Sequence, residues 1–128
     1  MAKFNIINKA EKVVDYVFTI TEKSPKKLRC DLVPELRKIA FRIMETIIRA
    51  NNFALNEETP PRDKVRRADL QKDCLASIRV LDATAEICNG GTRNYITKHQ
   101  LEVLTKLTQE LFDMVTKWML SDKTRVCG

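Results

Sequence analysis

The stretch Ile96–Trp118, ITKHQLEVLTKLTQELFDMVTKW, decides the fold, because it both starts a helix and shows which side of that helix is buried. Thr97 and Gln100 have the spacing of a capping box, in which each side chain accepts a hydrogen bond from the backbone N–H of the other residue. Ile96 and Leu101 flank the box as a hydrophobic staple. Apolar residues then recur at steps of three and four, at Leu104, Leu107, Leu111, Val115 and Trp118. This pattern predicts an amphipathic helix over residues 97 to about 121.

The same periodicity predicts three further helices, over residues of about 4–23, 32–51 and 62–89. The breaks between the helices hold nearly all the Pro and Gly residues. Asp31 is the expected N-cap of the second helix, and Gly90-Gly91 supply a residue for the left-handed conformation that ends many helices. Because no β-type alternation competes, we predict a single all-α domain, residues 1–128, folded as an antiparallel up-down four-helix bundle.

Composition and residue types exclude several classes of protein. Hydrophobic residues make up 44% of the chain, with three Gly and four Pro, which excludes a disordered or collagen-like chain. The four cysteines have no metal-binding spacing and are interpreted as buried or incidental thiols. One His and no glycine-rich phosphate loop leave no set of residues for catalysis. We therefore expect no enzyme activity, no cofactor and no metal.

The location of the protein is predicted from its apolar runs. None approaches the roughly 20 residues of a membrane span, and the first residues, MAKFNIINKAEK, lack the unbroken apolar core of a signal peptide. We therefore expect a cytoplasmic protein that has reduced thiols and no contact with a membrane.

Positive charge is concentrated in two regions. The net charge is +6, while residues 23–49 carry +5 and residues 62–79 carry +3. Such basic faces are typical of proteins that bind RNA or DNA through phosphates, and few aromatic residues are placed to stack on bases. For each residue taken singly, a solvated face with local ion pairs is the alternative. The residues expected to contact nucleic acid or an acidic partner protein are Lys38, Arg42, Arg49, Arg62, Arg66, Lys72 and Arg79.

The helix expected over 32–51 is apolar over more than half of its circumference, which exceeds what a four-helix monomer needs to bury. The surplus predicts a homo-oligomer. The residues expected at the subunit interface are Val33, Phe41, Met44 and Ile48. The alternative is a wide core, in which Phe41 and Met44 lie under the 51–61 loop.

Four segments resemble a small family of four-helix bundles. The family includes the proteins encoded in 23S rRNA intervening sequences and Avd, the accessory variability determinant of diversity-generating retroelements. The segments are Ser24-Pro25-Lys26-Lys27-Leu28-Arg29, Ile47-Ile48-Arg49-Ala50-Asn51, Leu75-Ala76-Ser77-Ile78-Arg79 and Thr97-Lys98-His99-Gln100-Leu101-Glu102, the last with Trp118 near the end of its helix. The third and fourth segments favour the Avd branch.

The resemblance to Avd implies a homopentameric, barrel-like assembly with a basic surface that binds RNA and DNA. It also implies a complex with the reverse transcriptase of the element, which supports mutagenic retrohoming. Arg79 matches a basic position of the third helix in that family. Two alternatives stay open, namely a protein of the 23S rRNA intervening-sequence type and a protein-interaction bundle that binds no nucleic acid.

Overall fold

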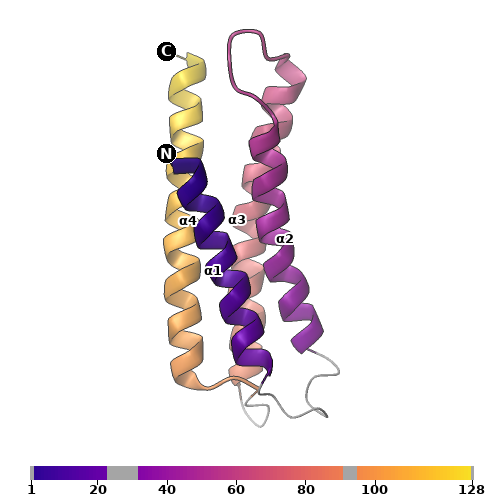
Figure 1. Ribbon diagram of the computed structural model, residues 1–128, viewed down its shortest axis with the longest axis vertical. Helices are drawn as coiled ribbons and strands as arrows, with labels where there is room; N and C mark the ends of the chain where they lie inside the picture. The colour runs from indigo at the N-terminus through magenta and orange to yellow at the C-terminus, as the bar shows by residue number, and fades with distance from the viewer. Residues whose placement is uncertain (1, 23–31, 91–94, 128) are drawn as a thin grey trace.

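The computed structural model describes residues 2–22, 32–90 and 95–127 of the chain. These residues form four helices: α1 (Ala2–Glu22), α2 (Val33–Asn52), α3 (Pro61–Asn89) and α4 (Lys98–Cys127). Figure 1 shows the four helices side by side along the long axis of the molecule. Within the described ranges there is no strand, so the fold is all-helical, as expected for a four-helix bundle.

The bounds of the helices differ from the expected ranges by at most two residues, with one exception. The exception is α4, which continues to Cys127 instead of ending near residue 121. The chain has no Gly or Pro between Thr97 and Gly128, so nothing in this part of the sequence breaks the helix earlier.

The start of α4 has the reciprocal bonds of a capping box. The backbone N–H of Gln100 donates to Thr97 Oγ1 at 3.0 Å, and the N–H of Thr97 donates to Gln100 Oε1 at 2.9 Å. Ile96, before the box, is 1% exposed, and Leu101, after it, packs against the core. The predicted capping box is confirmed.

The end of α3 differs from the expectation. Gly90 has φ −84° and ψ 142°, which is an extended conformation, and its N–H donates to the carbonyl of Ile87. Tyr95 N–H donates to the carbonyl of Cys88 at 2.7 Å. Gly90 is thus not left-handed, and the prediction for the Gly90-Gly91 pair stays a prediction for Gly91. Gly91 and the expected N-cap Asp31 lie outside the described residues.

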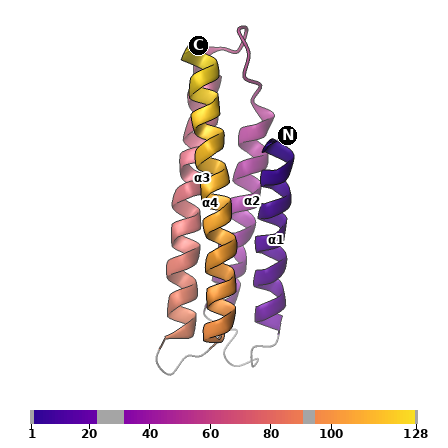
Figure 2. The same ribbon diagram turned by 90° about the vertical axis from the view of Figure 1, so that its left-hand side faces the viewer.

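One apolar core lies between the helices. Each helix packs against two others, in the order α1, α2, α3, α4 and back to α1 (Figure 2). Fully buried side chains come from all four helices, among them Val13, Leu36, Ile43, Leu81 and Leu111. In the described part of the chain, no helix has an apolar stretch long enough to cross a bilayer.

Candidate binding surfaces

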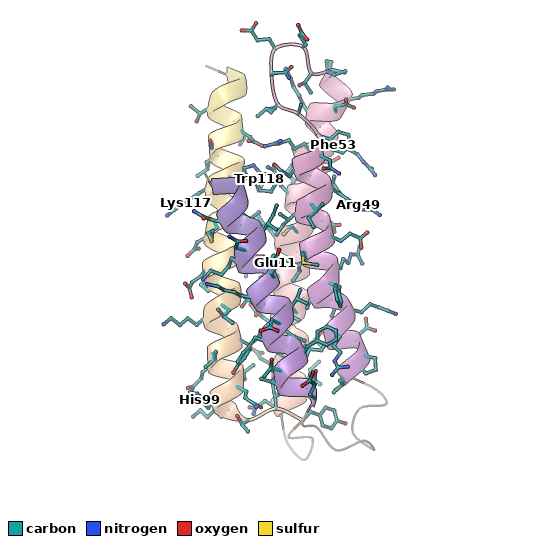
Figure 3. The ribbon with its side chains drawn as sticks, viewed as in Figure 1. Glu11, Arg49, Phe53, His99, Lys117 and Trp118 are labelled. Atoms are coloured by element: carbon teal, nitrogen blue, oxygen red, sulfur yellow. The ribbon has the colours of Figure 1, made fainter. Side chains whose placement is uncertain are left out.

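All seven basic residues selected from the sequence are exposed. Lys38, Arg42 and Arg49 lie on α2, and Arg62, Arg66, Lys72 and Arg79 lie on α3. These two helices pack directly against each other. Arg49 projects from the outer side of α2 in Figure 3, with 62% of its side chain exposed. Two adjacent helices thus present the cations to solvent.

Three of these arginines have carboxylate partners. Arg49 Nη2 lies 2.8 Å from Glu45 Oε1, one turn away on the same helix. Arg42 contacts Asp73 across the α2–α3 boundary, and Arg62 contacts its neighbour in sequence, both at 3.9 Å. Exposed ion pairs of this kind contribute about 0–1 kcal/mol. The arginines can therefore exchange a carboxylate for a phosphate at little cost.

Lys72 and Arg79 face α4 instead of α2. The guanidinium of Arg79 lies 4.6 Å from the centre of the Phe112 ring, and Lys72 lines a groove with residues of α4. Of the seven cations, Arg42 thus lies at the α2–α3 boundary, whereas Lys72 and Arg79 lie beside α4.

Beside Arg79, the Thr108 hydroxyl donates to Asp82 Oδ1 at 2.7 Å. Burial raises the pKa of the Asp82 carboxyl, against the opposing effect of this bond.

The residues expected at a subunit interface have different environments. Phe41 is 46% exposed and Ile48 is 41% exposed, while Met44 is partly buried against the core. Phe41 packs edge-to-face on Phe18 of α1, with ring centres 5.4 Å apart. Val33 is 2% exposed, so the structure places it in the interior instead of at the surface.

Four further large apolar residues are exposed and were not selected from the sequence: Val65, Val80, Ile87 and Leu120. Val80 and Ile87 are seven residues apart on α3 and share one face of it. Because Val80 and Ile87 lie off the buried stripe of α3, a helical wheel would have predicted that both are exposed.

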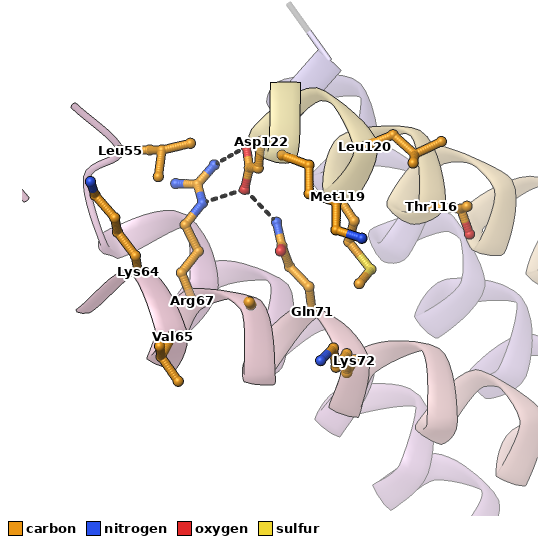
Figure 4. A pocket seen from close by; sticks show the side chains of 12 residues that line it. Leu55, Lys64, Val65, Arg67, Gln71, Lys72, Thr116, Met119, Leu120 and Asp122 are labelled. Carbon is orange, nitrogen blue, oxygen red and sulfur yellow. Dashed lines mark hydrogen bonds and ion pairs between the residues drawn. The ribbon is translucent and has the colours of Figure 1, made fainter. Parts of the chain in front are cut away.

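A buried polar cluster connects α3 to α4 (Figure 4). Arg67, whose side chain is 1% exposed, donates from Nε to Asp122 Oδ2 at 2.7 Å and from Nη2 to Oδ1 at 3.1 Å. Gln71 Nε2 donates to the same Asp122 Oδ2 at 2.9 Å, and Arg67 Nη1 donates to the carbonyl of Phe53 at 2.7 Å. The guanidinium also lies 5.2 Å from the centre of the Trp118 ring.

From the sequence, Arg67 is predicted only as one charge of the basic region at residues 62–79. Its position along α3 indicates its burial, because Arg67 lies seven residues before Cys74 on the buried stripe of that helix. Asp122 lies four residues after Trp118 on the buried stripe of α4. An arginine and an aspartate at core positions of adjacent helices predict a buried pair. The exposed charge of residues 62–79 is correspondingly lower than the sequence sum.

A groove of about 420 Å³ lies beside this cluster, between α3 and α4. Figure 4 shows Val65 on α3 and Leu120 on α4 at its sides, with Arg67, Gln71 and Asp122 between them. Elsewhere, the described residues include no group of three His, Cys, Asp or Glu side chains placed to hold a metal ion. The groove and the exposed cations are thus the candidate binding features.

Cys74 is expected to be chemically inert in the folded protein. Burial, and secondarily the negative charge of Asp73, raise the pKa of its thiol to about 12. Because the thiolate is the reactive form, we expect iodoacetamide at pH 8 to label Cys74 about a thousandfold more slowly in the native chain than in urea. Peptide mass spectrometry after timed labelling measures both rates. Equal rates with and without urea would contradict the buried position.

The described residues thus form an all-helical fold with exposed cations on α2 and α3 and a groove between α3 and α4. No protein-family model matches the chain, and comparisons with curated proteins and with solved structures found no match.

Proposed function

We propose that the protein is a basic, non-enzymatic accessory protein that binds nucleic acid through the phosphate backbone. The observation that carries this proposal is the exposure of all seven selected cations on two adjacent helices. Lysine and arginine side chains that neutralise phosphates release counterions, and this release drives binding that tolerates different sequences. RNA and DNA both present such phosphates.

In the proposed up-down topology, α2 and α3 are antiparallel, and cations of the two helices lie at matching levels. Arg42 contacts Asp73, whereas the carbonyl of Phe53, just after α2, accepts a bond from Arg67 near the start of α3. Moving forward along α2 thus corresponds to moving back along α3. Arg49 is seven residues after Arg42, and Arg66 is seven residues before Asp73. In that topology, two turns in each direction bring these two arginines to about the same level, about 10 Å along the helices from the Arg42 contact.

We further propose that the protein acts in the cytoplasm as a homo-oligomer together with the reverse transcriptase of a diversity-generating retroelement. Phe41 and Ile48 support the oligomer, because a single chain leaves both of them more than two-fifths exposed. The resemblance to Avd, which covers nearly the whole chain, supports the pentameric stoichiometry and the reverse-transcriptase partner.

A second candidate function is a bundle that binds an acidic protein and no nucleic acid. The exposed Phe41 beside Lys38 and Arg42 favours it, because a protein partner can bury this apolar side chain between the cations. A protein of the 23S rRNA intervening-sequence type is a further alternative within the same family resemblance.

The proposal is tested by the salt dependence of DNA binding. A variant with Lys38, Arg42, Arg49 and Arg66 all replaced by Gln removes four phosphate contacts. We expect the slope of log K against log salt for duplex DNA to become shallower by about 3–4, since each contact contributes about 0.9. Fluorescence anisotropy between low and moderate salt measures this slope.

The matched control changes the same charge on the other two helices, with Lys12, Lys98, Lys106 and Lys117 replaced by Gln. All four of these lysines are exposed. A slope that falls equally in both variants would mean that net charge, and not the α2–α3 surface, governs binding. Absence of binding by the parent protein at low salt would overturn the proposal and favour the protein-interaction alternative.

A further inference from the structure

The groove between α3 and α4 has an apolar surface and is open to solvent. It runs along residues 64–72 of α3 and 116–123 of α4 (Figure 4). Val65 and Leu120 flank it from the two helices, and each is 58% exposed. Met119 and Ala68 add partly buried apolar surface between them. Large apolar side chains on both sides of one groove are the kind of surface that a partner covers.

The charge around the groove is positive. Lys64, Lys72 and Lys123 line it, and among the described residues no carboxylate forms an ion pair with any of them. Asp122 is the one acid among the lining residues of the described chain, and both of its oxygens accept bonds from Arg67 or Gln71. Because Arg67 and Asp122 cancel each other, three lysine charges are left to attract an acidic ligand.

The length and the chemistry of the groove favour a helix over an acyl chain. Residues 64–72 of α3 rise about 12 Å, which is slightly more than two helical turns. An acyl chain offers at most one charge to the three lysines, whereas an amphipathic helix combines one apolar face with several flanking charges. Its apolar residues at positions i, i+3, i+4 and i+7 would face the groove.

We propose that this groove is the docking site for a short acidic amphipathic helix of a partner protein. The apolar face of that helix packs between Val65 and Leu120, and its flanking Asp or Glu residues face Lys64, Lys72 and Lys123. The bonds of Arg67 and Gln71 to Asp122 hold α3 and α4 together beneath the groove, so little ordering is needed on binding. This inference does not depend on nucleic-acid binding.

The test uses a fluorescently labelled synthetic helix of about 14 residues, with Leu at positions i, i+3, i+4 and i+7 and Glu at the flanking positions. Anisotropy titration against the full chain is expected to show saturable binding that weakens with added salt. A peptide with Lys in place of Glu, and one with Ser in place of Leu, are expected not to bind.

Two matched variants locate the binding site. Leu120→Gln is expected to weaken peptide binding about tenfold, because it removes one apolar side of the groove without changing the charge. Ile87→Gln, at a residue of α3 that is 49% exposed and does not line the groove, is expected to change the affinity less than about twofold. Thermal unfolding of both variants checks that each is folded, and Leu120→Ala serves as a milder variant.

Equal effects of the two variants on peptide affinity, or no binding of the acidic peptide, would overturn the proposal. A change in oligomeric mass caused by Leu120→Gln would assign the groove to a second copy of the chain and also overturn it. Weaker DNA binding by Leu120→Gln would assign the groove to nucleic acid and would likewise overturn the proposal. If the parent protein binds DNA but not the acidic peptide, this inference fails and the proposed function stands. If the parent protein binds the peptide but not DNA, the proposed function fails and this inference stands.

Discussion

Replacing Arg67 by Ala is expected to lower the free energy of unfolding by about 3–5 kcal/mol. The substitution leaves the Asp122 carboxylate, whose side chain is 12% exposed, without its bidentate partner. It also removes the donor to the Phe53 carbonyl and the cation over the Trp118 ring. A buried charge left unpaired costs more than the pair contributed, because its desolvation is no longer offset.

Urea unfolding followed by circular dichroism measures this difference. Arg66→Ala is the matched control, because Arg66 is the exposed neighbour of Arg67 and has no ion pair in the described chain. We expect the control to change the stability by less than about 0.5 kcal/mol. The double variant Arg67→Met, Asp122→Leu is expected to recover most of the loss, since it removes both charges together. Similar midpoints for Arg67→Ala and Arg66→Ala would contradict the buried pair.

Ile43→Ala is expected to destabilise the chain by about 2–5 kcal/mol. The Ile43 side chain is 0% exposed between the helices, so truncating it both loses apolar burial and leaves a cavity. Ile48 lies five residues further along the same helix and is 41% exposed. Ile48→Ala is therefore expected to cost less than about 1 kcal/mol in the isolated chain. Urea unfolding at low protein concentration compares the two variants.

The same pair of variants separates folding from assembly. If Ile48 lies at a subunit interface, Ile48→Ala lowers the oligomeric mass in light scattering at micromolar concentration while the unfolding free energy of the single chain stays near that of the parent. A parent protein that is monomeric at that concentration would remove Ile48 and Phe41 from any interface. Equal unfolding losses for Ile43→Ala and Ile48→Ala would contradict the assigned burial.

The helices were predictable because their signals are local. The capping box of Thr97 and Gln100 depends on residues three positions apart, and apolar spacing identifies the buried face of each helix. The conformation of Gly90 was not predictable in this way. A glycine permits the left-handed conformation without requiring it, and Gly90 is extended.

The candidate surfaces were predictable only in part, because a helical wheel shows which residues share a face but not which neighbouring helix they meet. Exposure of Lys72 and Arg79 followed from their positions, whereas their placement beside α4 depends on how α3 is rotated in the bundle. The same limitation applies to Val33, whose burial is set by packing around the start of α2. Side chains of both α3 and α4 form the groove, so no single stretch of the sequence predicted it.

The contact between Arg67 and Asp122 also restricts how the sequence can change over generations. The two residues are 55 positions apart in the chain, and their charges cancel at a site with little access to water. Replacing either residue first produces an intermediate protein with an uncompensated ion and a large loss of stability. Native proteins are stable by only about 5–15 kcal/mol, so such a loss is a large share of the total. Inherited variation at these two positions should therefore occur as joint replacements, while the neighbouring Arg66 is free to vary by itself.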